Sequence, residues 1–222
     1  TDKLPLLKKI GIPIIVSIAS EGDPQEFVTL ARRLDKIREI VAIELNISCP
    51  NIRNKQYLIS QDPKATYEVV SRVRRVTQKT IITKLSPNVI DIAEIAKAAE
   101  KAGSDAVSLI NTLIGMSIDV KTRKPKIASV TAGLSGPAIR PVAVRMAWEV
   151  YQKIKIPIIG MGGIIDTPSA LEFIIAGATA ISVGTANFIN PAVSVKIIQG
   201  IKGYLIKNNI KDINSVTGSL KV

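Results

Sequence analysis

The stretch IPIIGMGGIIDTPSALEFIIAGATAISVGTA (156–186) contains one complete strand–helix–strand unit. Short apolar runs predict strands at 157–160 and 180–184, and the amphipathic segment between them predicts a helix at 167–176. Both predicted strands end in glycine, within Gly-Met-Gly-Gly and Val-Gly-Thr. A strand joined through a helix to another strand predicts parallel pairing in one sheet.

The same alternation extends outward from this unit to both ends of the chain. Strands are predicted at 12–18, 41–48, 80–85 and 105–111. Helices are predicted at 24–38, 63–77, from 88 or 91 to 102, at 140–154 and at 191–207, several of them after Asp or Asp-Pro. The segment 115–136 has no helical period and predicts a lid or a hairpin beside a functional site.

Two α/β architectures fit six such units. A doubly wound sheet would hold a dinucleotide at a G-x-G-x-x-G turn after its first strand, and no such turn follows 12–18. A TIM (β/α)8 barrel collects its functional residues at the carboxyl ends of many strands, and polar residues or glycines end nearly every strand predicted here. We therefore expect a single barrel domain over 1–222, with about six of its eight units in this chain and the N-terminal units missing.

Composition excludes several kinds of chemistry. The 222 residues include no histidine and one cysteine, which removes Ser-His-Asp and Cys-His catalysis, ordinary zinc sites and an internal disulfide. The net charge of +12 comes from lysines and arginines scattered over helix faces without interleaved aromatics, so we expect no nucleic-acid partner. No apolar run reaches the ~18 residues of a membrane span and no signal peptide is visible, which predicts a cytoplasmic protein.

The two glycine-bearing strand ends predict a phosphate site. Glycine lets an oxyanion approach the backbone closely, and barrels bind phosphate at the loops after their last two strands. Alternatively, these glycines only form turns. The candidates are Gly162, Gly163, Gly184 and Thr185.

Three further strand ends carry side chains suited to catalysis. Cys49, in Ser-Cys-Pro-Asn, lies between Asn46 and Asn51, where a thiol could accept a proton, although a lone cysteine is more often an inert buried residue. Lys84 ends an apolar strand, where a charge is costly unless it meets an anion. Asn111 could serve the imide edge of a flat heterocycle or could simply be a turn residue.

Six strings, in order over about residues 12 to 200, resemble the class 1 dihydroorotate dehydrogenases, and most closely the FMN-binding catalytic subunit of the NAD-linked type. They are ELNISCPN (44–51), KLSPNVIDI (84–92), SLINTLIGMSID (108–119), GLSGPAIRP (133–141), IPIIGMGGI (156–164) and ISVGTANF (181–188). The resemblance implies an FMN-dependent TIM barrel that oxidises dihydroorotate to orotate in pyrimidine biosynthesis.

The resemblance also implies a role for each matching residue. Cys49 matches the base that removes the C5 proton of dihydroorotate while the C6 hydride goes to the flavin. Lys84 matches the lysine beside the flavin N1–C2 carbonyl. The residues that match substrate contacts are Asn46, Asn51, Asn111 and Thr112, and those that match FMN contacts are Asn46, Lys84, Ile110, Gly136, Gly162, Gly163, Gly184 and Thr185.

The chain departs from this family in three places. Ser17 stands where the family usually has asparagine, the loop 52–60 reads IRNKQYLIS instead of a glycine-rich sequence, and nothing matches the family's first two units. The NAD-linked type works with a subunit that carries FAD and an iron–sulfur cluster, which implies a heterotetramer, or a homodimer without that subunit. The chain has neither a four-cysteine cluster set nor an NAD fingerprint of its own.

Three other functions remain open at this point. One is a barrel of the dihydropyrimidine dehydrogenase type, which shares the FMN face but reduces uracil-like bases. Another is a phosphate-binding barrel lyase or synthase without flavin, and the last is a non-catalytic scaffold subunit. A flavin spectrum separates the first from the other two, and bleaching by dihydroorotate separates it from a dihydroorotate dehydrogenase.

Overall fold

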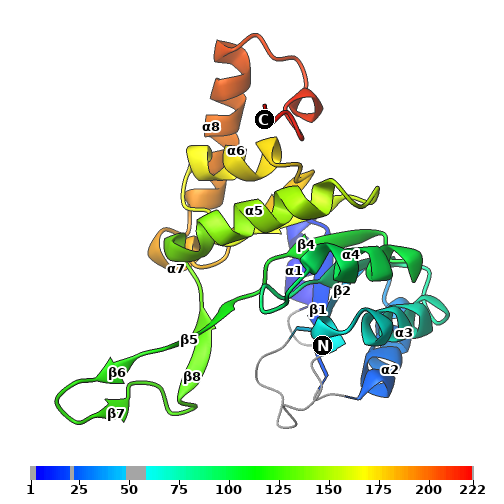
Figure 1. Ribbon diagram of the computed structural model, residues 1–222. Helices are drawn as coiled ribbons and strands as arrows, with labels where there is room; N and C mark the ends of the chain where they lie inside the picture. The colour runs from blue at the N-terminus through cyan, green and yellow to red at the C-terminus, as the bar shows by residue number, and fades with distance from the viewer. Residues whose placement is uncertain (1–3, 21–22, 49–58, 222) are drawn as a thin grey trace.

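The computed structural model describes residues 4–20, 23–48 and 59–221. Six parallel strands form one sheet in the order β1-β2-β3-β4-β9-β10, which follows the order of the chain without a reversal (Figure 1). A doubly wound sheet reverses its strand order, so this topology confirms the barrel prediction. The strands are β1 (Ile14–Ile18), β2 (Ile40–Asn46), β3 (Thr80–Lys84), β4 (Ala106–Leu109), β9 (Ile158–Met161) and β10 (Ala180–Ser182).

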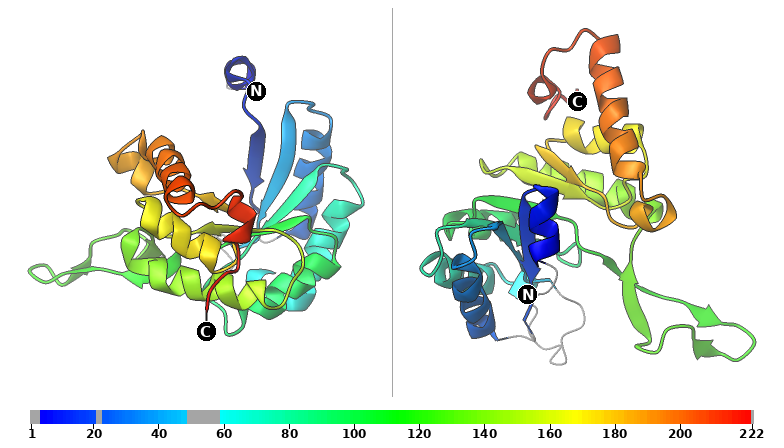
Figure 2. Two further views of the ribbon diagram at one scale, coloured as in Figure 1. Left: turned by 90° about the horizontal axis from the view of Figure 1, so that it is seen from above. Right: turned by 180° about the vertical axis from the view of Figure 1, so that it is seen from behind.

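The sheet is curled, and its helices lie on the outer side of the curve (Figure 2). Because each helix returns the chain to begin the next parallel strand, the helices and strands form two layers of a partial barrel. Strands β1 and β10 are the two edges of this sheet, so six units of the barrel are present, as the sequence predicts. The helices are α2 (Pro24–Asp35), α3 (Pro63–Arg74), α4 (Ile92–Lys101), α5 (Arg140–Tyr151), α6 (Thr167–Ile175) and α8 (Val193–Lys207).

Aspartate caps fix where four of these helices, α2, α3, α4 and α6, begin. Asp23 and Asp62 each accept a hydrogen bond from the backbone two residues on, and each precedes a proline at the first helical position. Asp91, rather than Asn88, begins α4, because its carboxylate accepts hydrogen bonds from the Ala93 and Glu94 amides. Three of the six predicted helices, those at 24–38, 63–77 and 140–154, end three residues earlier than the hydrophobic pattern suggested, and the other three end within one residue of it.

The core is divided by the sheet. The two largest clusters both fill the space between the strands and the outer helices. One includes Val107 and Phe173, and the other includes Phe27 and Ile81. A separate small cluster lies on the opposite face of the strands. Residues two apart on a strand share a face, so this inner face continues upward into polar residues toward the carboxyl ends. The inner cluster is Ala42, Ile82 and Ala106 with Ile159.

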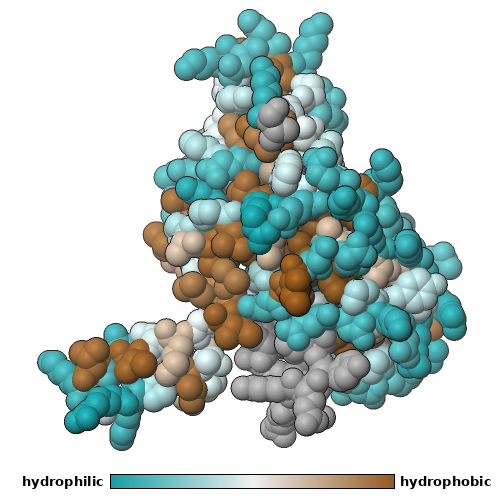
Figure 3. Space-filling model, in the orientation of Figure 1, coloured by the Kyte–Doolittle hydropathy of each residue, from teal (hydrophilic) through white to brown (hydrophobic). Residues whose placement is uncertain are grey.

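The segment 115–136 lies in an antiparallel arm, which confirms the hairpin alternative. Strands β5 (Leu113–Met116) and β8 (Thr131–Leu134) pair at its base, and β6 (Ile118–Asp119) pairs with β7 (Lys124–Pro125) at its tip. The arm projects from the body (Figure 1), and apolar side chains gather on it in the space-filling view (Figure 3). Its exposed hydrophobic residues are Ile114, Met116, Ile118, Val120, Ile127, Val130 and Leu134.

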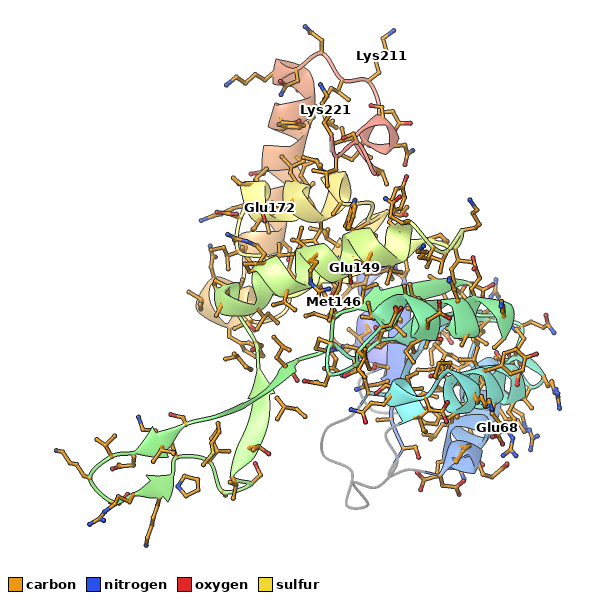
Figure 4. All side chains as sticks on the ribbon, viewed as in Figure 1. Glu68, Met146, Glu149, Glu172, Lys211 and Lys221 are labelled. Atoms are coloured by element: carbon orange, nitrogen blue, oxygen red, sulfur yellow. The ribbon has the colours of Figure 1, made fainter. Side chains whose placement is uncertain are left out.

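Some basic side chains of the outer helices pair with acidic ones. Arg140 of α5 meets Glu172 of α6 at 3.5 Å, and Arg72 meets Glu68 within α3 at 2.7 Å, with Glu172 and Glu68 on the outer layer in Figure 4. This arrangement agrees with the interpretation of the charges as a solvated helix surface. Among the described residues, no helix has the length and apolarity needed to cross a bilayer, and no group of potential ligands forms a metal site.

Two short helices were not predicted. Helix α1 (Leu4–Ile10) precedes the first strand, and α7 (Ala186–Ile189) follows directly after the Val-Gly-Thr end of β10. Both have seven residues or fewer, which is too short to show a clear helical period in the sequence.

Candidate active site

A cavity of about 320 Å³ opens at the carboxyl ends of β3, β4, β9 and β10. Functional sites of parallel barrels lie at this end of the strands. Nine of the residues singled out in the sequence line it, namely Lys84, Ile110, Asn111, Thr112, Gly136, Gly162, Gly163, Gly184 and Thr185. Cys49 and Asn51 lie outside the described residues.

Glycines form one wall of this cavity. Gly163 has a φ of +79°, and a Cβ atom there would lie 2.9 Å from the Gly136 carbonyl oxygen and 2.8 Å from the Arg140 Cβ. Only glycine therefore fits at this position, where the end of β9 meets the segment 136–140. At Gly184, in contrast, a Cβ atom would meet nothing within 4 Å. The backbone at Gly184 therefore faces open space beside the cavity.

Beside the cavity, the lining residue Asn111 belongs to a cluster of amides and hydroxyls whose other members, Asn46 and Ser48, do not line the cavity themselves. The Asn111 amide nitrogen donates to the Ser48 hydroxyl at 2.7 Å and to the Asn46 side-chain oxygen at 3.1 Å. The Ser48 hydroxyl in turn donates to the same Asn46 oxygen at 3.2 Å. These contacts tie the end of β2 to the end of β4, although β3 separates the two strands in the sheet. Asn46 and Ser48 are thus held against the cavity residue Asn111. Ser48 directly precedes the predicted base Cys49 in the sequence.

Among the described residues that line the cavity, Lys84 is the only one with a positively charged side chain. Its ammonium lies 3.7 Å from a carboxylate oxygen of Glu44, and the two side chains are 21% and 12% exposed. Glu44 also accepts hydrogen bonds from the hydroxyls of Ser17 and Ser108, both at 2.8 Å. The lysine therefore meets an anion inside the barrel, as its place in an apolar strand required.

Several lining residues were not anticipated from the sequence. Ser135 accepts a hydrogen bond from the Thr185 hydroxyl at 2.9 Å and joins the end of the arm to the end of β10. Its position just before Gly136 in GLSGP was a usable signal. Phe188 and Ile189 of α7 also line the cavity, although they are 93% and 79% exposed. Phe188 ends the string ISVGTANF (181–188), which was a usable signal, whereas nothing in the sequence context marks Ile189.

Asn88 links this site to the arm. Its amide donates to the Thr112 carbonyl at 3.1 Å, and its side-chain oxygen accepts from the Ile114 amide at 3.1 Å. These two bonds hold the chain as it passes from the cavity into β5. Asn88 therefore orients the segment that carries Asn111 and Thr112 rather than capping a helix.

A curled parallel sheet with glycines, a lysine and amides converging at its carboxyl edge defines a ligand-binding (β/α) barrel. The family model described as dihydroorotate dehydrogenase matches residues 2–205. The chain therefore belongs to the dihydroorotate dehydrogenase family, a family of oxidoreductases.

Individual relatives agree with this assignment. The chain is 49% identical over 221 residues to the "Dihydroorotate dehydrogenase B (NAD(+)), catalytic subunit" of Geotalea daltonii and covers 72% of that protein. It is 51% identical over 220 residues to the protein of the same name from Thermodesulfovibrio yellowstonii, again covering 72% of it.

A solved structure shares the fold. The crystal structure of DHODH from Eimeria tenella in complex with ferulenol superposes with a TM-score of 0.73 at 20% identity. The match covers 88% of this chain and 57% of that one. The likeness supports the partial-barrel architecture.

Proposed function

We propose that this protein oxidises dihydroorotate to orotate, with FMN as its bound cofactor, in pyrimidine biosynthesis. The single observation that carries the proposal is the convergence of nine family-type residues, from four strand ends and the end of the arm, on one cavity. Membership of the dihydroorotate dehydrogenase family supports the substrate, because its relatives carry that name.

The residues of the cavity fit an FMN molecule. Gly184 leaves open space where a phosphate could approach the backbone, and the glycine wall includes Gly162 and Gly163. Lys84 supplies a positive charge to the opposite part of the wall, where an electron-rich ring would be stabilised. The volume of the cavity, about 320 Å³, lies within the ~300–1,000 Å³ range of cofactor and ligand sites.

Each side chain has a task in this proposal. FMN, when bound, would accept the hydride from C6 of dihydroorotate. Cys49 removes the C5 proton, while Asn46, Asn111, Thr112 and Asn51 bind the polar edges of the pyrimidine. Ile110 packs against the ring, and the glycines with Thr185 hold the phosphate. The Asn111–Ser48 bond supports the role of Cys49, because it fixes the residue before the cysteine against a substrate-side amide.

We propose a partner subunit, an oligomeric state and a cellular location for the protein on the same grounds. The relatives are named catalytic subunits, which supports a partner subunit carrying FAD and an iron–sulfur cluster in a heterotetramer, with a homodimer as the alternative. We also propose a cytoplasmic location. The edges of β1 and β10 are both available within the described sheet, and two further β/α units between them would complete a single FMN-binding barrel domain.

Replacement of the cysteine tests the proposal. Cys49→Ala should leave FMN bound, because the glycine wall and Lys84 are unchanged, and should lower dihydroorotate oxidation by at least about 100-fold, the lower end of general-base effects. The rate of flavin bleaching under anaerobic conditions reports this step directly. Cys49→Ser, the matched variant, should retain a little activity, because a hydroxyl accepts a proton less readily at neutral pH. Unchanged bleaching in Cys49→Ala would refute the assignment of the base.

A further inference from the structure

Glu44 is a largely buried charge, 12% exposed, for which the proposed function has no task. It belongs to an inner-face cluster of four residues, Ser17, Glu44, Lys84 and Ser108, contributed by β1, β2, β3 and β4. One carboxylate oxygen accepts from Ser17 and approaches the Lys84 ammonium, while the other accepts from Ser108. Glu44 is not among the residues that line the cavity, whereas Lys84 is.

The strand register shows how Lys84 is drawn toward Glu44. Lys84 lies opposite Asn46 in the β2–β3 ladder, and Glu44 lies opposite Ile82, one pleat nearer to the amino ends of the strands. To approach Glu44 within 3.7 Å, the ammonium has to lean back by one pleat, away from the open end of the barrel. The two serines hold the carboxylate from both sides, so the carboxylate is the fixed member of the pair.

We propose that Glu44 is a positioning residue for Lys84: it holds the ammonium back from the cavity and cancels part of its charge at the flavin. This inference rests on the proposed function, because it requires FMN in the cavity. A cation beside the flavin ring stabilises the reduced, anionic form. By offsetting part of the positive charge of Lys84 at the flavin, Glu44 keeps the reduced flavin from becoming too stable to pass its electrons to an acceptor.

A structural role alone predicts a different result. If Glu44 only ties strands together, its charge is irrelevant and a neutral residue with the same shape serves equally well. Glutamine is such a residue, since its amide oxygen accepts a hydrogen bond and its amide nitrogen can donate to a serine hydroxyl. Glu44→Gln therefore removes the charge and keeps the bonds to Ser17 and Ser108.

The midpoint potential of the bound flavin is the decisive measurement, made by spectroscopic titration against reference dyes on the flavin-loaded product of the whole gene. For Glu44→Gln we expect the reduced flavin to gain about tenfold in stability, which is less than a unit charge in direct contact would give at an effective dielectric constant of about 20, because Glu44 does not line the cavity. For a two-electron couple this corresponds to a shift of about 30 mV in the positive direction. An unchanged or more negative potential would overturn the proposal.

Two further variants define how Glu44 acts. Glu44→Asp withdraws the carboxylate from Lys84 by one methylene, so its potential should lie between those of the wild type and Glu44→Gln; it also serves if the glutamine variant does not fold. Lys84→Met should lower the potential. In the Lys84→Met background, Glu44→Gln should shift the potential less than it does alone, and an equal shift would show that Glu44 acts independently of Lys84 and would exclude a positioning role.

A remote carboxylate provides the matched control. Glu100 accepts hydrogen bonds from the backbone of Lys155 and Ile156, away from the cavity, and Glu100→Gln changes the net charge by the same amount. Its potential should equal that of the wild type, and an equal shift there would overturn the proposal. A wild-type protein that holds no flavin would refute the proposed function and this inference with it, whereas a flavin-bearing protein with an insensitive potential would refute this inference alone.

Discussion

At the residue scale, two glycines of the cavity wall differ in what they require. Gly163 has a positive φ and no room for a Cβ atom beside the Gly136 carbonyl and Arg140, whereas Gly184 borders open space. The sequence shows both only as glycines after strands. The structure separates a glycine that the fold needs from one that a ligand would need.

This difference predicts two distinct alanine phenotypes. Gly163→Ala should destabilise the protein by about 1–3 kcal/mol, because the new methyl group meets the backbone in a conformation that L residues avoid. Gly184→Ala should keep the wild-type unfolding free energy but bind FMN more weakly, because the methyl group occupies space beside the phosphate site. Urea unfolding and flavin titration of both variants measure these effects. Equal flavin affinity in Gly184→Ala and the wild type would contradict the placement of the phosphate.

The inner-face cluster marks the limit of sequence interpretation at this scale. Lys84 could be recognised, because a lysine that ends an apolar strand needs an anion. Its partner could not be identified, since Glu44, Ser17 and Ser108 come from three other strands. Ser17 lies directly opposite Glu44 in the sheet, whereas Lys84 meets Glu44 diagonally. Ser17, where the resemblance led us to expect asparagine, donates a hydrogen bond to the Glu44 carboxylate.

At the element scale, the six strands and their helices were predictable because each strand is a short apolar run and each helix an amphipathic segment. Four of the six helices, α2, α3, α4 and α6, also begin at an aspartate cap. The pairing inside the arm was not, because residues 115–136 carry neither a clear alternation nor a strong turn signal. The short helix α7 escaped prediction for the same reason, and with it the contribution of Phe188 and Ile189 to the cavity.

The cap of α6 carries a prediction at this scale. Asp166 accepts a hydrogen bond from the Ser169 amide, and the Ser169 hydroxyl completes a capping box. Hydrogen bonds from the Ser169 hydroxyl and then from its amide lower the pKa of Asp166. A carboxylate whose pKa is lowered on folding stabilises the protein above the pKa of the unfolded state, and this stability is lost as the pH falls through the lower folded value.

Asp166→Ala should therefore cost about 1 kcal/mol of unfolding free energy at pH 7, as the loss of an N-cap does. The difference from the wild type should shrink as the pH falls below about 3.9, the ordinary pKa of an unfolded aspartate. Glu149 of α5, an exposed partner of Arg145, is the matched control, and Glu149→Ala should change stability by less than about 1 kcal/mol. A pH-independent difference for Asp166→Ala would contradict the charge-based account of the cap.

At the scale of the whole molecule, barrel topology explains why the site could be predicted at all. Parallel strands in chain order bring their carboxyl ends to one edge, so residues far apart in the sequence, from Lys84 to Thr185, reach one cavity. The position of Cys49 relative to this cavity rests on the sequence and on its neighbour Ser48, which Asn111 holds in place.

We propose above all that the cavity binds FMN and that dihydroorotate transfers its hydride to this FMN. Its most direct test is the visible absorbance spectrum of the purified whole gene product, recorded without oxygen before and after addition of dihydroorotate. The account predicts an oxidised flavin spectrum that dihydroorotate bleaches and that dihydrouracil leaves unchanged. A protein without a flavin spectrum, or a flavin that dihydrouracil bleaches and dihydroorotate does not, would contradict it.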